Sequence, residues 1–472
     1  MLTPLQATND AYSALKQGHL DRAEWLARQV LERNSNDVGM LKLLGAVQAG
    51  RMDWAESLVY YLAAIEVDPN DAEAWNNGAV VWQKLGKLDD ARKFVNRAIV
   101  LNPEYAQAFF NLGNLAGMQR EPEVAAAAYK QSIALNPDHA PSYSNLGRLM
   151  MATGGNGAEA AKLFRQVLKL APDYADAHLN LGNALQSMGN FEQALSQYQQ
   201  AIELFPNDVR LAHNLGSLYL EMGDRDTAKV HYLLALRING KSAASHHQLG
   251  KILQREGQLS LGIAHLQQAV SYEETNPAMW HTLGQLWKAT GALEGAVACF
   301  ERSIALAPGF AEAHWDLGRV LLDLGLWARG WPETEWRWHS QAYLAQQLPQ
   351  HRKVDRWDGS TLEGRSLLVW SEGDVETVVK FARFLPLLKL VSKNAIVIVE
   401  CDVTLASWMS AIPGVSQVIS KGDSVTADFQ IAIGSLPALL KCEDGGEAIP
   451  GPEGVANELP EDGVMVGDRF WV

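Results

Sequence analysis

The sequence predicts a mainly α-helical protein in which a superhelical solenoid of about ten helix pairs, residues 1–338, precedes a single α/β subdomain, residues 366–440. Proline recurs at a nearly constant interval along the first part, and small residues recur at a constant place between the prolines. After residue 365 the pattern changes to strands that alternate with helices, which is typical of a parallel sheet. We expect a linker or capping segment, residues 339–365, and a tail rich in Gly, Pro and acidic residues, 441–472.

The interval between the prolines is 34 residues, with one exception. The phrases IEVDP, IVLNP, IALNP, LKLAP and IELFP end at Pro69, Pro103, Pro137, Pro172 and Pro206, and the register resumes at Pro308 in IALAP. One interval is longer by a single residue, in the glycine-rich turn ATGGNGAEAA. Such a period predicts repeated helix pairs that each end at a proline, since proline cannot continue a helix.

Each repeat keeps a small residue at one place in its first helix and another in its second. Counted from the first residue of the repeat, position 8 holds Gly45, Gly113, Gly147, Gly182, Gly216, Gly250, Gly284 and Gly318, with Ala79 as the exception. Twelve residues later, or thirteen in the repeat with the longer turn, come Ser57, Ala91, Ala125, Ala160, Ala194, Ala228, Gly262 and Ala296. Glycine inside a helix costs about 1 kcal/mol relative to alanine, so its recurrence predicts close contact between the paired helices.

This pattern resembles the tetratricopeptide repeat (TPR) and extends from residue 4 to about residue 338. The resemblance implies units that begin at Pro4, Val38, Ala72, Ala106, Ala140, Ala175, Val209, Ala243, Pro277 and Ala311. Stacked helix pairs of this kind form a TPR superhelical solenoid with an extended concave surface, which is the usual binding face of the architecture.

Asparagine recurs two positions before the glycine of the first helix, at Asn77, Asn111, Asn145, Asn180 and Asn214. Asn114 and Asn183 follow one helical turn later on the same face. Asparagine is a mediocre helix former, so its recurrence indicates a specific role. An amide offers both a donor and an acceptor, which suits an extended peptide backbone. The ladder resembles that of the O-linked N-acetylglucosamine transferases, whose repeats hold substrate polypeptides in this way, and it implies the same role for these seven residues. The alternative is that each amide bonds to the backbone of a neighbouring repeat and stiffens the stack.

Composition limits the partner and the compartment. The chain has 472 residues and a net charge of −14, which disfavours nucleic acid and anionic membranes as partners. Its three cysteines, Cys299, Cys401 and Cys442, lack metal-ligand spacing and fit a reducing compartment. The start of the chain has no basic segment followed by an apolar run. We therefore expect a cytoplasmic protein with no membrane insertion, no metal and no cofactor.

Tryptophan and then alternating elements mark the end of the repeats. Seven of the 15 tryptophans fall between Trp315 and Trp370, several of them in GLWARGWPETEWRWHS, where they can cap the last helix pair. The pattern beyond predicts strands at 366–370, 395–400, 417–419 and 429–433, and helices at 376–390 and 404–411. This alternation predicts a single Rossmann-like α/β subdomain.

The same region resembles the junction in bacterial TPR-linked glycosyltransferase-like proteins, which read W-G-E-Q-G-x-G-D-T-x-Q-F. The chain reads WSEGDVETVVKFARFLPLLK, with Trp370, Glu372, Phe381, Arg383, Leu385 and Pro386 matching. Ser371, Asp374 and Glu376 replace the loop glycines, and two acids there disfavour phosphate binding. We expect Glu372 and Asp374 to be solvated loop acids. The resemblance implies a degenerate, truncated glycosyltransferase domain, because the chain stops about where a second half would begin.

The sequence therefore favours a protein–protein interaction scaffold. An extended polypeptide segment would occupy the TPR groove, and the glycosyltransferase-like part would be a non-catalytic docking module with no catalytic residues. One alternative is a nucleotide-sugar-dependent protein O-glycosyltransferase whose second half is missing or supplied in trans. Another is a self-assembling structural TPR protein, a homo-oligomer in which the groove of one copy takes a segment of the next.

Overall fold

The computed structural model describes residues 4–344 and 354–442, which fall into two compact units, residues 1–238 and residues 239–472. Most of the predicted tail, 441–472, and part of the predicted linker, 339–365, lie outside the described residues. Among the residues described, no helix has the length and apolar character needed to cross a bilayer.

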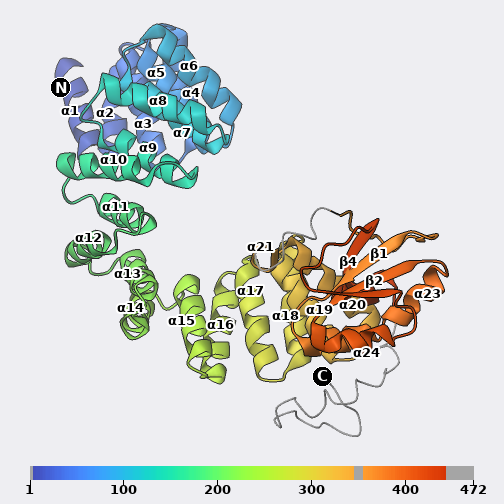
Figure 1. The fold of residues 1–472 in the computed structure, drawn as a ribbon. Coiled ribbons are helices and arrows are strands. Elements are labelled where there is room, and N and C mark those ends of the chain that lie inside the picture. The colour runs from blue at the N-terminus through green and yellow to red at the C-terminus, as the bar shows by residue number, and fades with distance from the viewer. Residues whose placement is uncertain (1–3, 345–353, 443–472) are drawn as a thin grey trace. The chain divides into compact units, whose positions relative to one another are not determined.

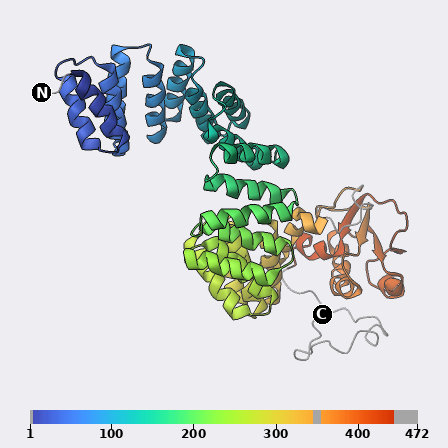
Figure 2. The same cartoon turned by 90° about the vertical axis from the view of Figure 1, so that its left-hand side faces the viewer.

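The first unit consists of antiparallel helix pairs that follow one another in chain order (Figures 1 and 2). Its helices are α1 (Pro4–Lys16), α2 (Leu20–Leu31), α3 (Val38–Gly50), α4 (Trp54–Val67), α5 (Ala72–Lys84), α6 (Leu88–Leu101), α7 (Ala106–Met118), α8 (Pro122–Leu135), α9 (Ala140–Ala152), α10 (Gly157–Leu170), α11 (Ala175–Ser187), α12 (Phe191–Leu204), α13 (Val209–Glu221) and α14 (Arg225–Ile238). The first helix of each pair begins at the residue where the sequence period places the start of a repeat.

The second unit begins with the same helix pairs and ends with a small sheet. Its helices before the sheet are α15 (Ala243–Arg255), α16 (Leu259–Tyr272), α17 (Pro277–Ala289), α18 (Leu293–Leu306), α19 (Ala311–Asp323) and α20 (Trp327–Thr334), followed by the 3-10 helix η1 (Glu335–His339) and α21 (Gln341–Leu344). Here too the odd-numbered helices α15, α17 and α19 begin at the predicted starts of repeats.

Local sequence explains where the helices begin and end. The Asp37, Asp53 and Asp71 carboxylates accept hydrogen bonds from backbone N–H groups in the first turns of α3, α4 and α5. The second residue after most first helices is a glycine in the left-handed region, such as Gly86 (φ 75°) and Gly189 (φ 74°), where a glycine is the least strained choice.

Six of the eight position-8 glycines make room for a ring from the second helix of the pair; Gly250 and Gly318 face Leu266 and Thr334 instead. A Cβ atom added to Gly113 would lie 2.5 Å from Cε1 of Tyr129, and one added to Gly216 would lie 2.8 Å from Cε1 of Tyr232. The small residue twelve positions on allows the same approach from the other side: the Ser57 hydroxyl donates a 2.7 Å hydrogen bond to the carbonyl of Gly45. Close contact within each pair, predicted from the small residues, is therefore present, and in six pairs a ring fills the space above the position-8 glycine.

A four-stranded parallel sheet forms the end of the second unit. Its strands are β1 (Ser366–Trp370), β2 (Ile396–Cys401), β3 (Gln417–Ser420) and β4 (Phe429–Ala432), in the order β3-β2-β1-β4. All of its pairings are parallel, with Leu368 opposite Ile398 in β2 and Gln430 in β4. The order changes direction at β1, because β2 and β3 lie on one side of it and β4 lies on the other.

The connections of the sheet are short helices, and one prediction about them is wrong. They are α22 (Val375–Ala382), η3 (Leu385–Leu387), α23 (Leu388–Val391), η4 (Val403–Leu405), α24 (Ala406–Ser410), η5 (Ile433–Ser435) and α25 (Leu436–Leu439). The sequence predicted one continuous helix over 376–390, whereas α22 ends at Ala382. Pro386 accounts for the break, because its ring excludes an unbroken helix across this point.

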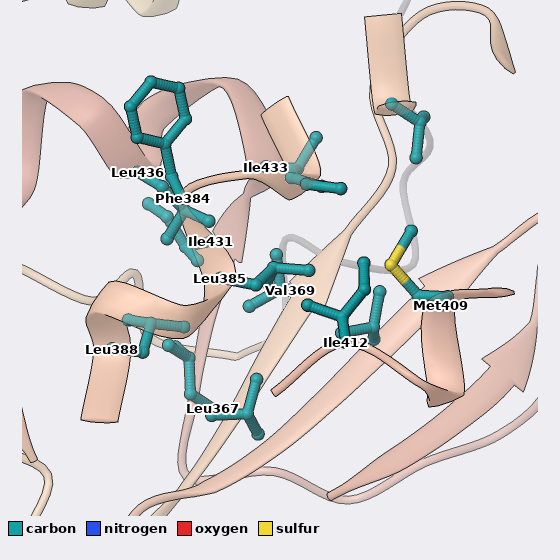
Figure 3. Packing of buried hydrophobic residues seen from close by; sticks show 14 of the residues in the cluster. Leu367, Val369, Phe384, Leu385, Leu388, Met409, Ile412, Ile431, Ile433 and Leu436 are labelled. Atoms are coloured by element: carbon teal, nitrogen blue, oxygen red, sulfur yellow. The ribbon is translucent and has the colours of Figure 1, made fainter. Parts of the chain in front are cut away.

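One face of the sheet packs against these short helices (Figure 3). Leu367 and Val369 of β1 and Ile431 of β4 lie among Leu385 from the connection after β1 and Ile412 from the connection after β2. All five side chains are almost fully buried. Alternate residues of the strands thus form one core, as expected for strands covered by helices.

The tryptophan-rich segment joins the last helix pair to this sheet. Trp331 of α20 packs edge-on against Phe381 and Phe384, with ring centroids 5.9 and 5.7 Å apart, respectively. Trp338 of η1 packs on Trp370 at the end of β1. These rings were predicted to cap the last helix pair, and in the structure they cover it with the sheet domain.

A buried ion pair completes the same junction and corrects the expectation for Glu372. The Arg337 guanidinium of η1 donates to Glu372 Oε1 at 2.9 Å and to the Ser435 hydroxyl at 2.7 Å. The Tyr343 hydroxyl donates to the other Glu372 oxygen. The Glu372 side chain is only 9% exposed, so it is not a solvated loop acid. Asp374 is exposed and caps α22 by accepting a hydrogen bond from the Thr377 N–H, as a loop acid can.

Gly113→Ala is expected to destabilise the protein by about 1–3 kcal/mol, because the new methyl group would overlap the Tyr129 ring. Gly117→Ala in the same helix is the matched control. Nothing lies within 4 Å of its added Cβ, so it is expected to stabilise by up to about 1 kcal/mol through helix propensity alone. Urea denaturation of the two variants measures both effects; equal changes in the two would show that the ring contact does not constrain position 8.

Arg337→Met is expected to destabilise the second unit by about 3–5 kcal/mol, because it leaves the Glu372 carboxylate buried without a cation. Arg337→Met combined with Glu372→Gln should recover part of the loss, since the uncompensated charge is gone. Arg329→Met, which removes an exposed pair with Glu301, is the control and should cost less than about 1 kcal/mol. Denaturation followed by tryptophan fluorescence measures all three; a double variant as unstable as Arg337→Met alone would contradict the ion-pair explanation.

Candidate functional site

A cavity of about 700 Å³ lies in the first unit, on the first helices of three successive pairs. Four of the seven predicted peptide-binding residues line it: Asn114 on α7, Asn145 on α9, and Asn180 and Asn183 on α11. Tyr129 of α8 and Phe164 of α10 form its floor from the second helices. The remaining three predicted residues, Asn77, Asn111 and Asn214, do not line this cavity.

The amides of the cavity bind one another between neighbouring repeats. Asn145 Nδ2 donates to Asn114 Oδ1 at 2.8 Å, and the Tyr129 hydroxyl donates to the same oxygen at 2.8 Å. Asn145 is at position 6 of its repeat, whereas Asn114 and Tyr129 are at positions 9 and 24 of the preceding repeat. The tyrosine whose ring packs on the position-8 glycine thus also donates to the position-9 amide, which accepts the hydrogen bond from the next repeat.

The same arrangement recurs at the other end of the cavity. Asn214 Nδ2 donates to Asn183 Oδ1 at 2.7 Å, and the Tyr198 hydroxyl donates to that oxygen at 2.5 Å. Burial raises the pKa of Tyr129 and of Tyr198, so both hydroxyls remain protonated donors across the physiological range. Asn114 and Asn183 accept two bonds each on oxygen and keep their amide hydrogens for other partners.

Asn111 and Asn77 differ from the residues of the cavity. Asn111 is only 6% exposed, and its Nδ2 donates to Asn76 Oδ1 at 2.8 Å. In the repeat before that of Asn111, position 9 is Val80, whose side chain cannot accept a hydrogen bond. Asn76 of the same repeat is the acceptor instead. Asn77 is half-buried, and its oxygen lies 3.4 Å from Asn76 Nδ2. Asn111 therefore links neighbouring repeats inside the stack. Its partner is a side chain of the preceding repeat, whereas the alternative stated above expected the backbone.

Asn180 lacks an internal partner in the part of the chain that the structure describes, and the reason is the residue at position 9 of the preceding repeat. That residue is Arg148, which cannot accept a hydrogen bond as Asn114 and Asn183 do. Arg148 is exposed, lines the cavity, and forms no ion pair among the described residues. In the middle of the cavity, the Asn180 amide and the Arg148 guanidinium therefore have no hydrogen-bond or ion-pair partner among the described residues.

Apolar side chains complete the cavity, and these are residues that sequence reasoning missed. Met118 from α7, and Leu149 and Met151 from α9, line its sides. The residue types at the positions of Met151 and Met118 vary from unit to unit, so the period gave no signal for them, whereas the position of Leu149 is apolar in all units after the first and indicates packing. Arg148 could have been found from the sequence, because it stands where the position-9 pattern is interrupted, whereas Asn76 is at position 5 and interrupts neither pattern.

The arrangement suits recognition of a main chain better than catalysis or metal binding. Among the described residues, no partner is present for the amide hydrogens of Asn114 and Asn183, the amide oxygen of Asn145 and the whole amide of Asn180. Within residues 4–344 and 354–442, no cluster of three or more His, Cys, Asp or Glu side chains could hold a metal ion.

Comparison with known families agrees with the helix pairs. Models described as "Tetratricopeptide repeat" or "TPR repeat" match residues 9–72, 60–93, 83–140, 154–189, 175–208, 197–229 and 289–330. Together these ranges take in more than half of the chain. The chain is a tetratricopeptide-repeat protein.

Known TPR proteins resemble parts of it. Superkiller protein 3 of Schizosaccharomyces pombe is 24% identical over 134 residues, which are 26% of this chain and 10% of that protein. Hsp70-Hsp90 organizing protein 3 of Arabidopsis thaliana is 28% identical over 78 residues, 16% of this chain and 14% of that protein. This TPR protein thus spans a small part of the length of either relative. Among solved structures, YrrB, described as a TPR protein with an unusual peptide-binding site, is 21% identical with a TM-score of 0.36; the match covers 40% of this chain and 96% of YrrB.

Asn111→Ala is expected to destabilise the protein by about 1–3 kcal/mol, because it leaves the buried Asn76 oxygen without its donor. Asn180→Ala is expected to change stability by less than about 0.5 kcal/mol, since no internal hydrogen bond is lost. Both substitutions lie at position 6, so they are matched in helix position and in chemistry. Thermal and urea unfolding measure the difference; a loss for Asn180→Ala as large as for Asn111→Ala would show that both amides are structural.

Proposed function

We propose that this TPR protein is a scaffold that holds an extended segment of a partner protein in the cavity formed by α7, α9 and α11. The single observation that carries the proposal is the unused amide of Asn180 between two pairs of amides that are already held in place. Amides fixed by their neighbours lose little conformational freedom when a ligand binds, which is the benefit of a preorganised site.

The distribution of donors and acceptors supports a peptide backbone as the ligand. A main chain offers N–H and C=O groups alternately, and the cavity offers hydrogens at Asn114 and Asn183 and oxygens at Asn145 and Asn180. At about 0.5–1.5 kcal/mol net for each hydrogen bond, four such bonds provide about 2–6 kcal/mol before ordering costs. The amides alone thus support micromolar or weaker binding that tolerates many sequences.

Arg148 and the apolar side chains add selectivity to this general recognition. An unpaired guanidinium beside the amides favours a carboxylate, either an acidic side chain or a C-terminus. Met118 and Met151 provide adaptable apolar contacts for a neighbouring side chain. We infer a preference for a segment in which one acidic residue stands close to an apolar one.

A relative supports a protein partner. The Arabidopsis protein is named for organising Hsp70 and Hsp90, and its similarity to this chain falls in repeats of the same family. A protein partner for this chain is consistent with that name, while the identity of the partner is left to experiment.

The sheet domain is proposed to be a glycosyltransferase-like docking module without catalysis. Glu372, the acid of the motif shared with bacterial TPR-linked glycosyltransferase-like proteins, is taken up by Arg337 and Tyr343 of the same chain. A carboxylate held in this way supports the junction with the last helix pair and is not free for a substrate. The alternative, a protein O-glycosyltransferase, predicts transfer of labelled sugar from a nucleotide sugar to an acceptor peptide, which the docking interpretation does not.

The groove is tested with a displayed library of unstructured peptides and purified full-length protein. Peptides selected by the wild type are expected to bind Asn180→Ala at least fivefold more weakly, and Arg148→Gln more weakly only where the peptide carries a carboxylate. N-methylation of single peptide bonds should reduce binding more than alanine scanning of the same peptide, since the amides contact the main chain.

Asn77→Ala is the matched control, because this amide is at position 6 but outside the cavity. Selected peptides should bind it as they bind the wild type. Equal losses for Asn77→Ala and Asn180→Ala, or a library that yields no peptide competing for the cavity, would contradict the proposal. Selection of segments of this chain itself, with a concentration-dependent molar mass in light scattering, would instead favour self-assembly.

A further inference from the structure

We propose that a second cavity, about 450 Å³ in the second unit, binds a small organic anion through phosphate or carboxylate oxygens. The cavity lies between α17, α19 and the tryptophan-rich junction on one side and the loops that follow β1 and β4 on the other. It is separate from the peptide groove in its residues and in its proposed ligand chemistry, so either proposal can fail without the other.

Three cationic side chains from three helices converge on this cavity. They are Lys288 of α17, Arg319 of α19 and Lys380 of α22, and none of them forms an ion pair within the described parts of the chain. Arg319 stacks over the Trp315 ring, with its Cζ 6.0 Å from the centroid, and this contact leaves its N–H groups available. Grouping three like charges is unfavourable unless an anion joins them, and it stands out in a chain whose net charge is −14.

The acidic side chains of the cavity do not neutralise these cations. Glu372 is held by Arg337 and Tyr343, so its charge is already offset. Asp323 also lines the cavity and is the remaining carboxylate in its wall. Against Lys288, Arg319 and Lys380 it leaves an excess of positive charge, which is the condition for binding an anion.

A buried indole lies in the wall of the same cavity. Trp331 is only 3% exposed and lines the cavity, and its buried Nε1–H has no hydrogen-bond acceptor among the residues that the structure describes. A buried donor without a hydrogen bond costs about 1–3 kcal/mol, so such groups normally have a partner. The indole therefore serves as a reporter in the cavity wall, and the converging cations carry the argument for an anion.

The position of the cavity in the sheet explains why a site can exist there. Gly373 follows β1 and Gly434 follows β4, the two strands between which the strand order changes direction. In parallel sheets, crevices for ligands lie beyond the carboxyl ends of the strands at such a point. The N-terminus of α22 is not the binding element, because Asp374 already caps it. The anion would instead contact Lys380, near the other end of that helix.

The size and walls of the cavity limit the ligand. A volume of 450 Å³ is within the range of small-molecule sites, and Trp315, Trp331 and Phe381 supply apolar surface beside the cations. The ligand class is therefore a small molecule with two or more negative charges and a compact apolar or planar part.

The lysines make the affinity dependent on pH. Burial, Arg319 and, for Lys380, Arg383 lower the pKa values of Lys288 and Lys380, whereas Asp316, Asp323 and Glu376 act in the opposite direction. A bound anion stabilises the protonated lysines, so binding is expected to take up protons and to weaken as pH rises toward the lowered pKa values.

The test is isothermal titration calorimetry of the full chain with inorganic pyrophosphate and with citrate, at constant ionic strength. The two probes distinguish a preference for phosphate oxygens from one for carboxylates. Saturable binding of at least one probe is expected, weakened at least tenfold in Lys288→Gln, Arg319→Gln and Lys380→Gln. The controls Arg302→Gln and Lys393→Gln remove exposed cations outside the cavity and should bind as the wild type does.

A second measurement separates the site from a general effect of charge. The indole N–H resonance of Trp331 should shift on addition of the probe in the wild type and not in Arg319→Gln at the same concentration. Without ligand, each cation-to-Gln variant should melt at the same temperature as the wild type or higher, because repulsion within the cavity is reduced. The proposal is overturned if neither probe binds saturably, or if the control variants lose as much affinity as the cavity variants.

Discussion

The contact on which the rest of the structure depends is that of an aromatic ring against a glycine within a helix pair. At Gly45, Gly113 and Gly182, the ring of Tyr61, Tyr129 or Tyr198 occupies the space that a Cβ atom would need. The repeat at Ala72 keeps this contact one position earlier: a Cβ atom on Gly78 would lie 3.0 Å from Cδ1 of Phe94, while Ala79 and Val95 lie in one buried cluster. Because the contact sets how closely and in what phase the two helices meet, it also determines where the polar end of each tyrosine emerges.

That polar end connects packing to the candidate site. In two repeats the tyrosine hydroxyl bonds to the position-9 asparagine, and this amide receives the position-6 asparagine of the next repeat. The packing of the tyrosine ring therefore fixes the positions of these amides directly, through hydrogen bonds. In one repeat position 9 is Ser217, and its hydroxyl lies 3.0 Å from the Tyr232 hydroxyl. The bond between positions 9 and 24 is therefore kept when another hydrogen-bonding residue replaces the asparagine. Position 9 of the next repeat is Lys251, whose side chain cannot accept a hydrogen bond from a neighbouring amide.

The sequence predicted the helix pairs, their first residues and the parallel strands, because each rests on a period or on local residue types. It could not decide which amides are inside the stack. Asn111 and Asn180 stand at the same position, and they differ because Asn76 and Arg148 stand on the neighbouring helices. The burial of Glu372 was missed for a similar reason, since its partner Arg337 lies 35 residues earlier in a segment that reads only as aromatic. Properties of one helix follow from its own residues, whereas the environment of a polar group depends on what another element places beside it.

The same comparison separates structural from functional polar groups throughout the chain. Arg337 has carboxylate, hydroxyl and carbonyl acceptors around it, and a ligand could gain little from it. Lys288, Arg319 and Arg148 line cavities without forming an ion pair, and Asn180 lines one without a hydrogen-bond partner, as far as residues 4–344 and 354–442 show. A fold retains such groups at a cost, since each could be replaced by a neutral or apolar residue without loss of an internal bond. Their presence in two cavities, one rich in amides and one rich in cations, is the physical reason for assigning a main chain to the first and an anion to the second.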